Sequence, residues 1–193
     1  MRAFACWVFP PAVALLVWSA RSSPVDARQG NRKSVSPANN SARTWIVEGA
    51  LGGLFAAVVY DLFRLPFVLN GYPLFAVFPR FGQMLLQSAP DDFSWPVQVA
   101  GWTYHFVNAA SLGIMFLAMA ARPTPRKLFG GAMAWALGVE TFLLLSPYYS
   151  FFKLKLDYGV FLALTLSAHL IFGAALGWWC VKRIVQSPQG AAS

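Results

Sequence analysis

Residues 105–113 read HFVNAASLG, and residues 169–177 read HLIFGAALG. The two stretches share one pattern, in which a histidine is followed by two apolar residues, then by small residues and a closing Leu-Gly. They contain the only two histidines of the chain. Repeats in membrane proteins often place a binding site at the interface between the repeated units. The pattern predicts two helical hairpins of the same orientation, related by a pseudo-two-fold axis along the membrane normal.

The composition around these stretches is that of a membrane protein. Of the 193 residues, 58% are hydrophobic and 11% are charged, whereas a soluble domain carries about 25% charged residues. Four apolar runs are each long enough to cross the hydrocarbon core as a helix; they cover residues 45–69, 97–121, 127–148 and 158–181. We expect an all-α polytopic bundle of four transmembrane helices, built as two parallel-repeat hairpins, with an extra apolar segment at the N-terminus.

The chain divides into four regions by composition. Residues 1–20 are apolar and fit a signal-like segment, an anchor or an upstream extension. Residues 21–44 are rich in Ser, Arg, Asn and Pro, which predicts a disordered basic linker. Residues 45–184 form the four-helix domain and residues 185–193 a short tail. Within the domain, residues 73–86 are too short to cross, so we expect them to lie on or dip into the outer surface.

The net charge of +8 predicts the orientation in the membrane. Basic residues cluster beside the apolar runs, which is typical of loops retained in the cytoplasm and not of nucleic-acid binding. Ten lie in the linker, the second loop and the tail: Arg21, Arg28, Arg32, Lys33, Arg43, Arg122, Arg126, Lys127, Lys182 and Arg183. Three lie in the opposite loops: Arg80, Lys153 and Lys155. We therefore expect both ends of the four-span body in the cytoplasm. Cys6 and Cys180 have no spacing that indicates a disulfide or a zinc site.

Small residues at four-residue spacing predict which helix faces meet. Such spacing lets two helix backbones approach closely. The predicted packing residues are Gly49, Gly53 and Ala57 in the first run, Ala109 and Gly113 in the second, and Gly173 and Gly177 in the fourth. Asp61, His105 and His169 continue these same faces, so their side chains are expected to point into the bundle. Glu140 aligns with Ala132 and Ala136 in the same way.

Each hairpin then presents one carboxylate and one imidazole at a similar depth. At about 1.5 Å per residue, Asp61 and His105 lie about 22 and 24 Å from the inner end, and Glu140 and His169 both about 18 Å. A charge at this depth is costly unless it is paired. We expect an Asp61/His105 pair and a Glu140/His169 pair, with Arg64 and Asn108 as further polar groups of the same set.

Several functions fit this set of polar residues. A proton or small-solute relay would use the imidazoles, which change charge near neutral pH. In a purely structural role the pairs fix helix packing, and Arg64 neutralises Asp61 three residues away. No cofactor is predicted, although His105 and His169 are the residues that would ligate a metal or haem. An accessory role would involve a homodimer or another membrane protein held at the glycine seams. No arrangement typical of an enzyme stands out.

Several short stretches resemble a group of small bacterial inner-membrane proteins that includes the YagU-like proteins. They are WTYHFVNAASLGIMF (residues 102–116), the proline-containing basic loop after it, the LLLSP end of the third run, and AHLIFGAALGWW (residues 168–179). The resemblance covers about residues 45–183. It implies a four-span inner-membrane protein and carries over no active-site residues.

Overall fold

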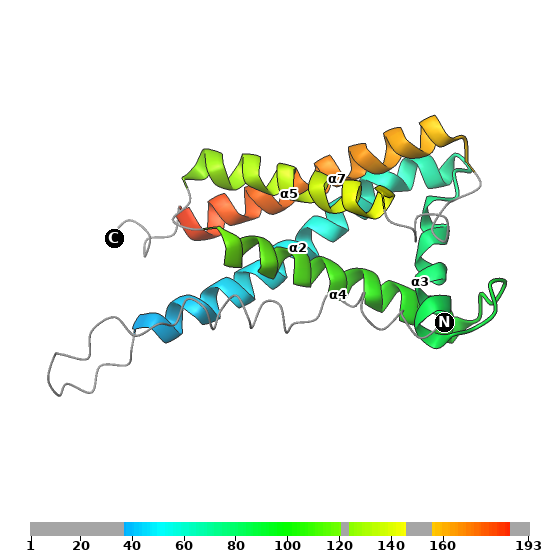
Figure 1. Ribbon diagram of the computed structural model, residues 1–193, viewed down its shortest axis with the longest axis horizontal. Helices are drawn as coiled ribbons and strands as arrows, with labels where there is room; N and C mark the ends of the chain where they lie inside the picture. Colours follow the sequence, from blue (N-terminus) through cyan, green and yellow to red (C-terminus); the bar gives the residue numbers. More distant parts are fainter. Residues whose placement is uncertain (1–36, 121–123, 146–155, 186–193) are drawn as a thin grey trace, which may run out of the picture.

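The computed structural model describes residues 37–120, 124–145 and 156–185 (Figure 1). These residues form helices joined by short connections, and none of them lies in a strand. In chain order they are α2 (Pro37–Leu69), a 3-10 helix (Leu74–Ala76), α3 (Val77–Leu86), α4 (Trp95–Met119), α5 (Pro125–Leu145), α7 (Tyr158–Cys180) and a π-helical turn (Val181–Val185). The all-α fold class is confirmed for this part of the chain.

The first helix starts earlier than the apolar run that predicts it. α2 begins at Pro37, so residues 37–44 are helical, which differs from the disordered linker predicted there. Proline is accepted in a first helical turn because its missing N–H would have no partner there. The following residues, 38–44, contain no Pro or Gly that would stop a helix extending backward from the apolar run. Residues 1–36 and 186–193, with the predicted N-terminal segment and tail, lie outside the described residues.

Local signals set the ends of the helices that flank the site. α2 ends at Leu69. The side-chain amide of the next residue, Asn70, donates to the carbonyl of Pro66 at 2.7 Å, and Gly71 follows with a φ of 89°. This left-handed conformation is open to glycine at little cost. α7 begins after Asp157, whose Oδ1 accepts from the backbone N–H of Val160 at 3.1 Å. This contact is an N-cap, which satisfies one of the free donors of the first turn.

The long helices pack in pairs that alternate in direction. α2 lies along α4, α5 lies along α7, and α2 also packs against α7, which joins the two pairs. Figure 1 shows α2 and α5 running one way and α4 and α7 running the other. The start of α2 and the end of α7 therefore lie toward the same end of the bundle. α3 sits at the opposite end and packs mainly against α4.

Glycines lie where α2 and α4 are in closest contact. A Cβ added at Gly53 would lie 2.0 Å from the carbonyl oxygen of Ala109, and one added at Gly113 would lie 2.1 Å from that of Gly49. These spaces are too small for any side chain. Ala57, one turn further along α2, is fully buried. The backbones of α2 and α4 are therefore in direct contact along the face that the four-residue spacing indicates.

In the α5 and α7 pair, the glycines that contact the other helix all lie on α7. A Cβ added at Gly173 would lie 2.7 Å from the Cα of Met133, and one at Gly177 would lie 2.9 Å from the Cα of Phe129. The glycines of α5 differ, because a Cβ at Gly130 would meet nothing within 4 Å. The chain has two Gly-Gly pairs at the starts of apolar runs, residues 52–53 on α2 and residues 130–131 on α5, and only the first is in close contact with other helices.

The short segment before α4 is also held by glycine contacts. A Cβ at Gly82 of α3 would lie 1.9 Å from the carbonyl oxygen of Val97, and Gly101 meets Phe78 in the same way. Leu74–Leu86 is an apolar helical stretch too short to span a membrane, as residues 73–86 were predicted to be. Its contacts fasten it across the first turns of α4, where it closes one end of the bundle.

The helices differ in whether they can cross a membrane. Within the described residues, three are long and apolar enough to do so: Trp45–Leu69, Pro125–Leu145 and Tyr158–Arg183. α4 is not among these three; it has 25 residues and no charged side chain, and it contains Gln, Thr, Tyr, His and Asn residues. Three apolar spans identify an integral membrane protein by length and composition.

Candidate functional site

The first polar pair joins α2 to α4. The Nε2 atom of His105 lies 3.0 Å from Oδ2 of Asp61, and about one seventh of each side chain is exposed. The close contact between the glycines of α2 and α4 brings these two side chains together. The other carboxylate oxygen of Asp61, Oδ1, is buried and has no hydrogen-bond partner in the part of the chain that the structure describes. The pair thus matches the one expected from the depths of the two residues.

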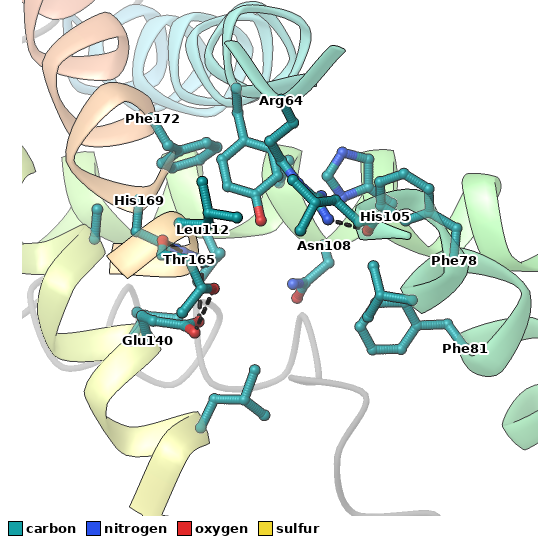
Figure 2. A pocket seen from close by; sticks show the side chains of 18 of the residues that line it. Arg64, Phe78, Phe81, His105, Asn108, Leu112, Glu140, Thr165, His169 and Phe172 are labelled. Carbon is teal, nitrogen blue, oxygen red and sulfur yellow. Dashed lines mark hydrogen bonds and ion pairs between the residues drawn. The ribbon is translucent and has the colours of Figure 1, made fainter. Parts of the chain in front are cut away.

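The second pair joins α5 to α7. The Nε2 atom of His169 lies 3.2 Å from Oε2 of Glu140, whose side chain is only 3% exposed. The hydroxyl of Thr165 donates to the other carboxylate oxygen of Glu140 at 2.8 Å. The Nδ1 atom of His169 lies 2.8 Å from the backbone carbonyl of Thr165. Glu140 and His169 are therefore held by one helical turn of α7 (Figure 2).

The hydrogen bonds of His169 indicate how many protons this pair holds. A carbonyl oxygen only accepts, so Nδ1 of His169 carries a proton and donates to Thr165. The contact between Nε2 and the Glu140 carboxylate then needs a second proton, on either the imidazole or the carboxyl. The Glu140–His169 pair is therefore neutral overall in both arrangements.

The Asp61–His105 pair can hold a different number of protons. A neutral His105 can donate from Nε2 to Asp61, because its Nδ1 has no hydrogen-bond partner among the described residues. The Asp61–His105 pair then carries one negative charge. The two pairs look alike in sequence, but the Asp61–His105 pair carries one negative charge only while His105 is neutral, whereas the Glu140–His169 pair is neutral in both of its arrangements.

Tyr60 links the two pairs. Its ring centroid lies 5.9 Å from that of His105 and 5.2 Å from that of His169. Tyr60 precedes Asp61 on α2, the helix that contacts both α4 and α7. An aromatic ring with a polar tip therefore separates the two imidazoles in the middle of the bundle.

Arg64 does not pair with Asp61. The Nη2 atom of Arg64 donates to the backbone carbonyl of Leu74 in the 3-10 helix. The guanidinium carbon lies 4.9 Å from the ring centroid of Tyr60 and 5.4 Å from those of Phe75 and Phe78. The side chain points toward the segment before α3, and no ion pair to Asp61 forms within the described residues. The expected neutralisation of Asp61 by Arg64 is therefore replaced by a carbonyl and aromatic contact, although the two charges remain on one helix.

A cavity of about 150 Å³ lies between the four long helices. Five of the six candidate residues line it, namely Arg64, His105, Asn108, Glu140 and His169, while Asp61 lies behind His105. Figure 2 shows Glu140, Thr165 and His169 on one side of this space, His105 and Arg64 on the other, and Asn108 between them. A cavity of this size with several polar side chains in its lining has room for several water molecules. The structure thus brings the sequence-derived residues to one place.

Sequence reasoning missed Thr165 and Tyr60. Thr165 precedes His169 by four residues, so a helical wheel would place its hydroxyl on the same face, which is the signal that could have found it. Tyr60 gives no such signal, because its position between the imidazoles depends on how α2 is rotated against α7. These two residues connect the polar pairs that the sequence predicts separately.

The two histidines do not share a metal-like cluster. Over residues 37–120, 124–145 and 156–185, no three His, Cys, Asp or Glu side chains are grouped as metal ligands would be. Each imidazole faces its own carboxylate, and Tyr60 lies between them. The metal or haem hypothesis for His105 and His169 stays a prediction.

No family model, curated protein or solved structure matches this chain. The resemblance to YagU-like proteins therefore stays a prediction. The chemistry of the site has to be argued from its own residues.

Proposed function

We propose that the protein moves a small solute across a bacterial inner membrane together with protons, through the cavity between the two carboxylate–imidazole pairs. In this proposal α2, α4, α5 and α7 are the four spans, arranged as two hairpins with both ends of the body in the cytoplasm. The observation that supports this proposal most is that both pairs are formed, at 3.0 and 3.2 Å, on opposite sides of one cavity.

The packing of α4 supports its role as a fourth span. Its 25 residues correspond to about 37 Å of helix, which exceeds a hydrocarbon core of about 30 Å. Its polar residues His105 and Asn108 line the cavity, away from lipid. A span that lines a polar space needs fewer apolar residues than one surrounded by lipid. Polar residues on α4 are therefore expected of a helix that lines the site.

The chemistry of the pairs supports proton-linked movement. Imidazoles change charge near neutral pH, and buried carboxylates bonded to them can exchange a proton with them over a single hydrogen bond. The cavity between the pairs gives space for water or a solute to approach both. Alternating protonation of the two sides would then be tied to occupancy of the cavity.

Proton flux into proteoliposomes tests this proposal. The full-length protein is reconstituted with a trapped pH-sensitive dye, and an acid pulse is applied outside. Asp61→Asn and Glu140→Gln keep the shape of each side chain but remove its exchangeable carboxylate, so each should reduce protein-dependent flux at least about tenfold. Glu48→Gln is the matched control, because Glu48 bonds Trp179 at the far end of α2 and lies outside the cavity. Unchanged proton flux in both Asp61→Asn and Glu140→Gln would rule the proposal out.

A structural role is the second candidate, because each polar pair joins the two helices of one packed pair. If packing is the whole function, Asp61→Asn and Glu140→Gln will lower stability in proportion to the lost hydrogen bonds, and the wild-type protein will show no flux above empty liposomes. Unfolding measured on the same samples separates the two roles.

A further inference from the structure

Arg64 is the one charged side chain of the cavity whose hydrogen bonds are incomplete within the described residues. It is 6% exposed, and its Nη1 atom is buried without a partner. Its Nη2 atom is occupied by the carbonyl of Leu74. A buried guanidinium with a free N–H loses hydration without regaining it, which favours any acceptor that can reach the site.

Other cavity groups also offer donors. The indole Nε1 of Trp135 is buried with no partner over residues 37–120, 124–145 and 156–185, and Trp135 lines the same cavity. The side-chain amide of Asn108 has no partner among the described residues, and it lies in the middle of the space in Figure 2. The carboxylate of Glu140 is already engaged, because it bonds both His169 and Thr165. Oδ1 of Asp61, which has no partner among the described residues, lies behind His105 and not in the cavity lining. The cavity therefore has spare donors and one positive charge, which suits an anion.

A count of charges connects this anion to protons. With His105 neutral, Arg64 contributes one positive charge, the Asp61–His105 pair one negative charge, and the Glu140–His169 pair none. The empty site is thus neutral. An added monoanion would leave one negative charge inside the bundle, which is costly unless a proton enters with it. His105 lines the cavity, and its Nδ1, which has no hydrogen-bond partner among the described residues, is the atom that can take this proton.

We propose that the cavity binds a small organic monocarboxylate on Arg64 and takes up one proton on His105 with it. This inference rests on the proposed proton-linked transport and names its substrate class. A guanidinium and a carboxylate form charge-assisted hydrogen bonds that neutral solutes cannot match. Apolar residues such as Leu112, Leu143 and Leu164 line the rest of the cavity and suit a short hydrocarbon tail. The volume of about 150 Å³ restricts the ligand to small acids.

Binding of acetate and of acetamide to the purified full-length protein tests the charge requirement. The two molecules have the same shape, and only acetate is an anion. Titration calorimetry, with tryptophan fluorescence as a second readout, should show acetate binding at least about tenfold more tightly than acetamide. Equal binding of the two would overturn the proposal.

Substitution of Arg64 tests the position of the site. Arg64→Gln should weaken acetate binding at least about tenfold, and Arg64→Lys should retain part of it because the charge remains. Arg126→Gln is the control, since Arg126 is an exposed arginine at the start of α5. If Arg64→Gln does not fold, Arg64→Lys should still shift the acetate affinity while Arg126→Gln does not. Equal acetate affinity in the Arg64 and Arg126 variants would overturn the proposal.

Proton uptake on binding tests the role of His105. Acetate titrations in buffers of different ionisation enthalpy should give about one proton taken up per acetate, and this value should fall toward zero in His105→Gln. Proton uptake that is unchanged in His105→Gln would overturn this part of the proposal.

The two proposals fail separately. Proton flux that depends on Asp61 and Glu140, in a protein that does not bind acetate, would overturn the monocarboxylate site and leave proton movement intact. Acetate binding that depends on Arg64, without any flux, would uphold the site and rule out transport.

Discussion

Thr165 shows how a single residue can hold both members of a buried carboxylate–imidazole pair. It donates to Glu140 through its side chain and accepts from His169 through its backbone carbonyl. The second contact fixes which imidazole nitrogen carries the proton, and the first occupies one carboxylate oxygen. Glu140 is 2% exposed, so water cannot easily replace either contact. Both members of this pair are therefore held in place by a residue that does not itself ionise.

Removal of the Thr165 hydroxyl should destabilise the protein. Thr165→Val keeps the shape of the side chain and leaves one oxygen of Glu140 without its donor, which should cost about 1–3 kcal/mol in the free energy of unfolding. Thr165→Ser keeps the hydroxyl and serves as the control. Reversible unfolding in mixed detergent micelles measures both variants. Equal stability of Thr165→Val and the wild type would show that the hydrogen bond contributes nothing.

At the scale of elements, close backbone contact decides which side chains meet. α2 and α4 touch at Gly53 and Gly113, and this brings Asp61, two turns beyond Gly53, to within hydrogen-bond distance of His105. A larger residue at the seam would separate the helices and stretch that bond. α7 is also held to α2 at its other end, where Trp179 donates to Glu48 at 3.1 Å. The polar site is therefore positioned by contacts at the glycine seam and beyond it.

Two glycine substitutions should act in opposite directions. Gly53→Ala places a Cβ 2.0 Å from a backbone oxygen of α4, so the helices must move apart, at a cost of about 1–3 kcal/mol. Gly138→Ala on α5 meets nothing within 4 Å, and alanine favours a helix by up to about 1 kcal/mol over glycine. Thermal unfolding followed by circular dichroism should show a lower transition temperature for Gly53→Ala and an equal or higher one for Gly138→Ala. A similar loss in both would contradict the role of the seam.

At the scale of the whole molecule, the membrane topology depends on whether α4 crosses the membrane. If α4 crosses, the connection before it and the start of α5 lie on opposite sides of the membrane. If it does not cross, the two lie on the same side. The positive charges of Arg126, Lys127, Lys182 and Arg183 gather at one end of the bundle, which favours a cytoplasmic location for that end.

Cysteine labelling in intact cells tests this topology. Asp91→Cys and Arg126→Cys are made singly in a chain whose Cys6 and Cys180 are changed to serine; both target positions are exposed. A membrane-impermeant maleimide should label position 91 from outside, and position 126 only after the membrane is opened. Labelling of both positions from the same side would show that α4 does not cross.

The sequence alone determines the elements and the faces they present. Apolar length predicts the long helices, and small residues at four-residue spacing predict the contact between α2 and α4, because both depend on local periodicity. The same periodicity places Asp61, His105, Glu140 and His169 toward the interior. Equal depth then predicts the two pairs, since a buried charge needs a partner at its own height.

Only the tertiary structure decides which partner each polar group reaches. Arg64 lies on the same helix as Asp61 but bonds Leu74, because the 3-10 helix folds back over the end of α2. Tyr60 lies between the imidazoles because of how α2 is rotated against α7. The cavity and its free donors follow from these rotations. The physical reason is that the spacing of residues along one helix specifies a face, whereas a site depends on how faces of separate helices are rotated and shifted against one another.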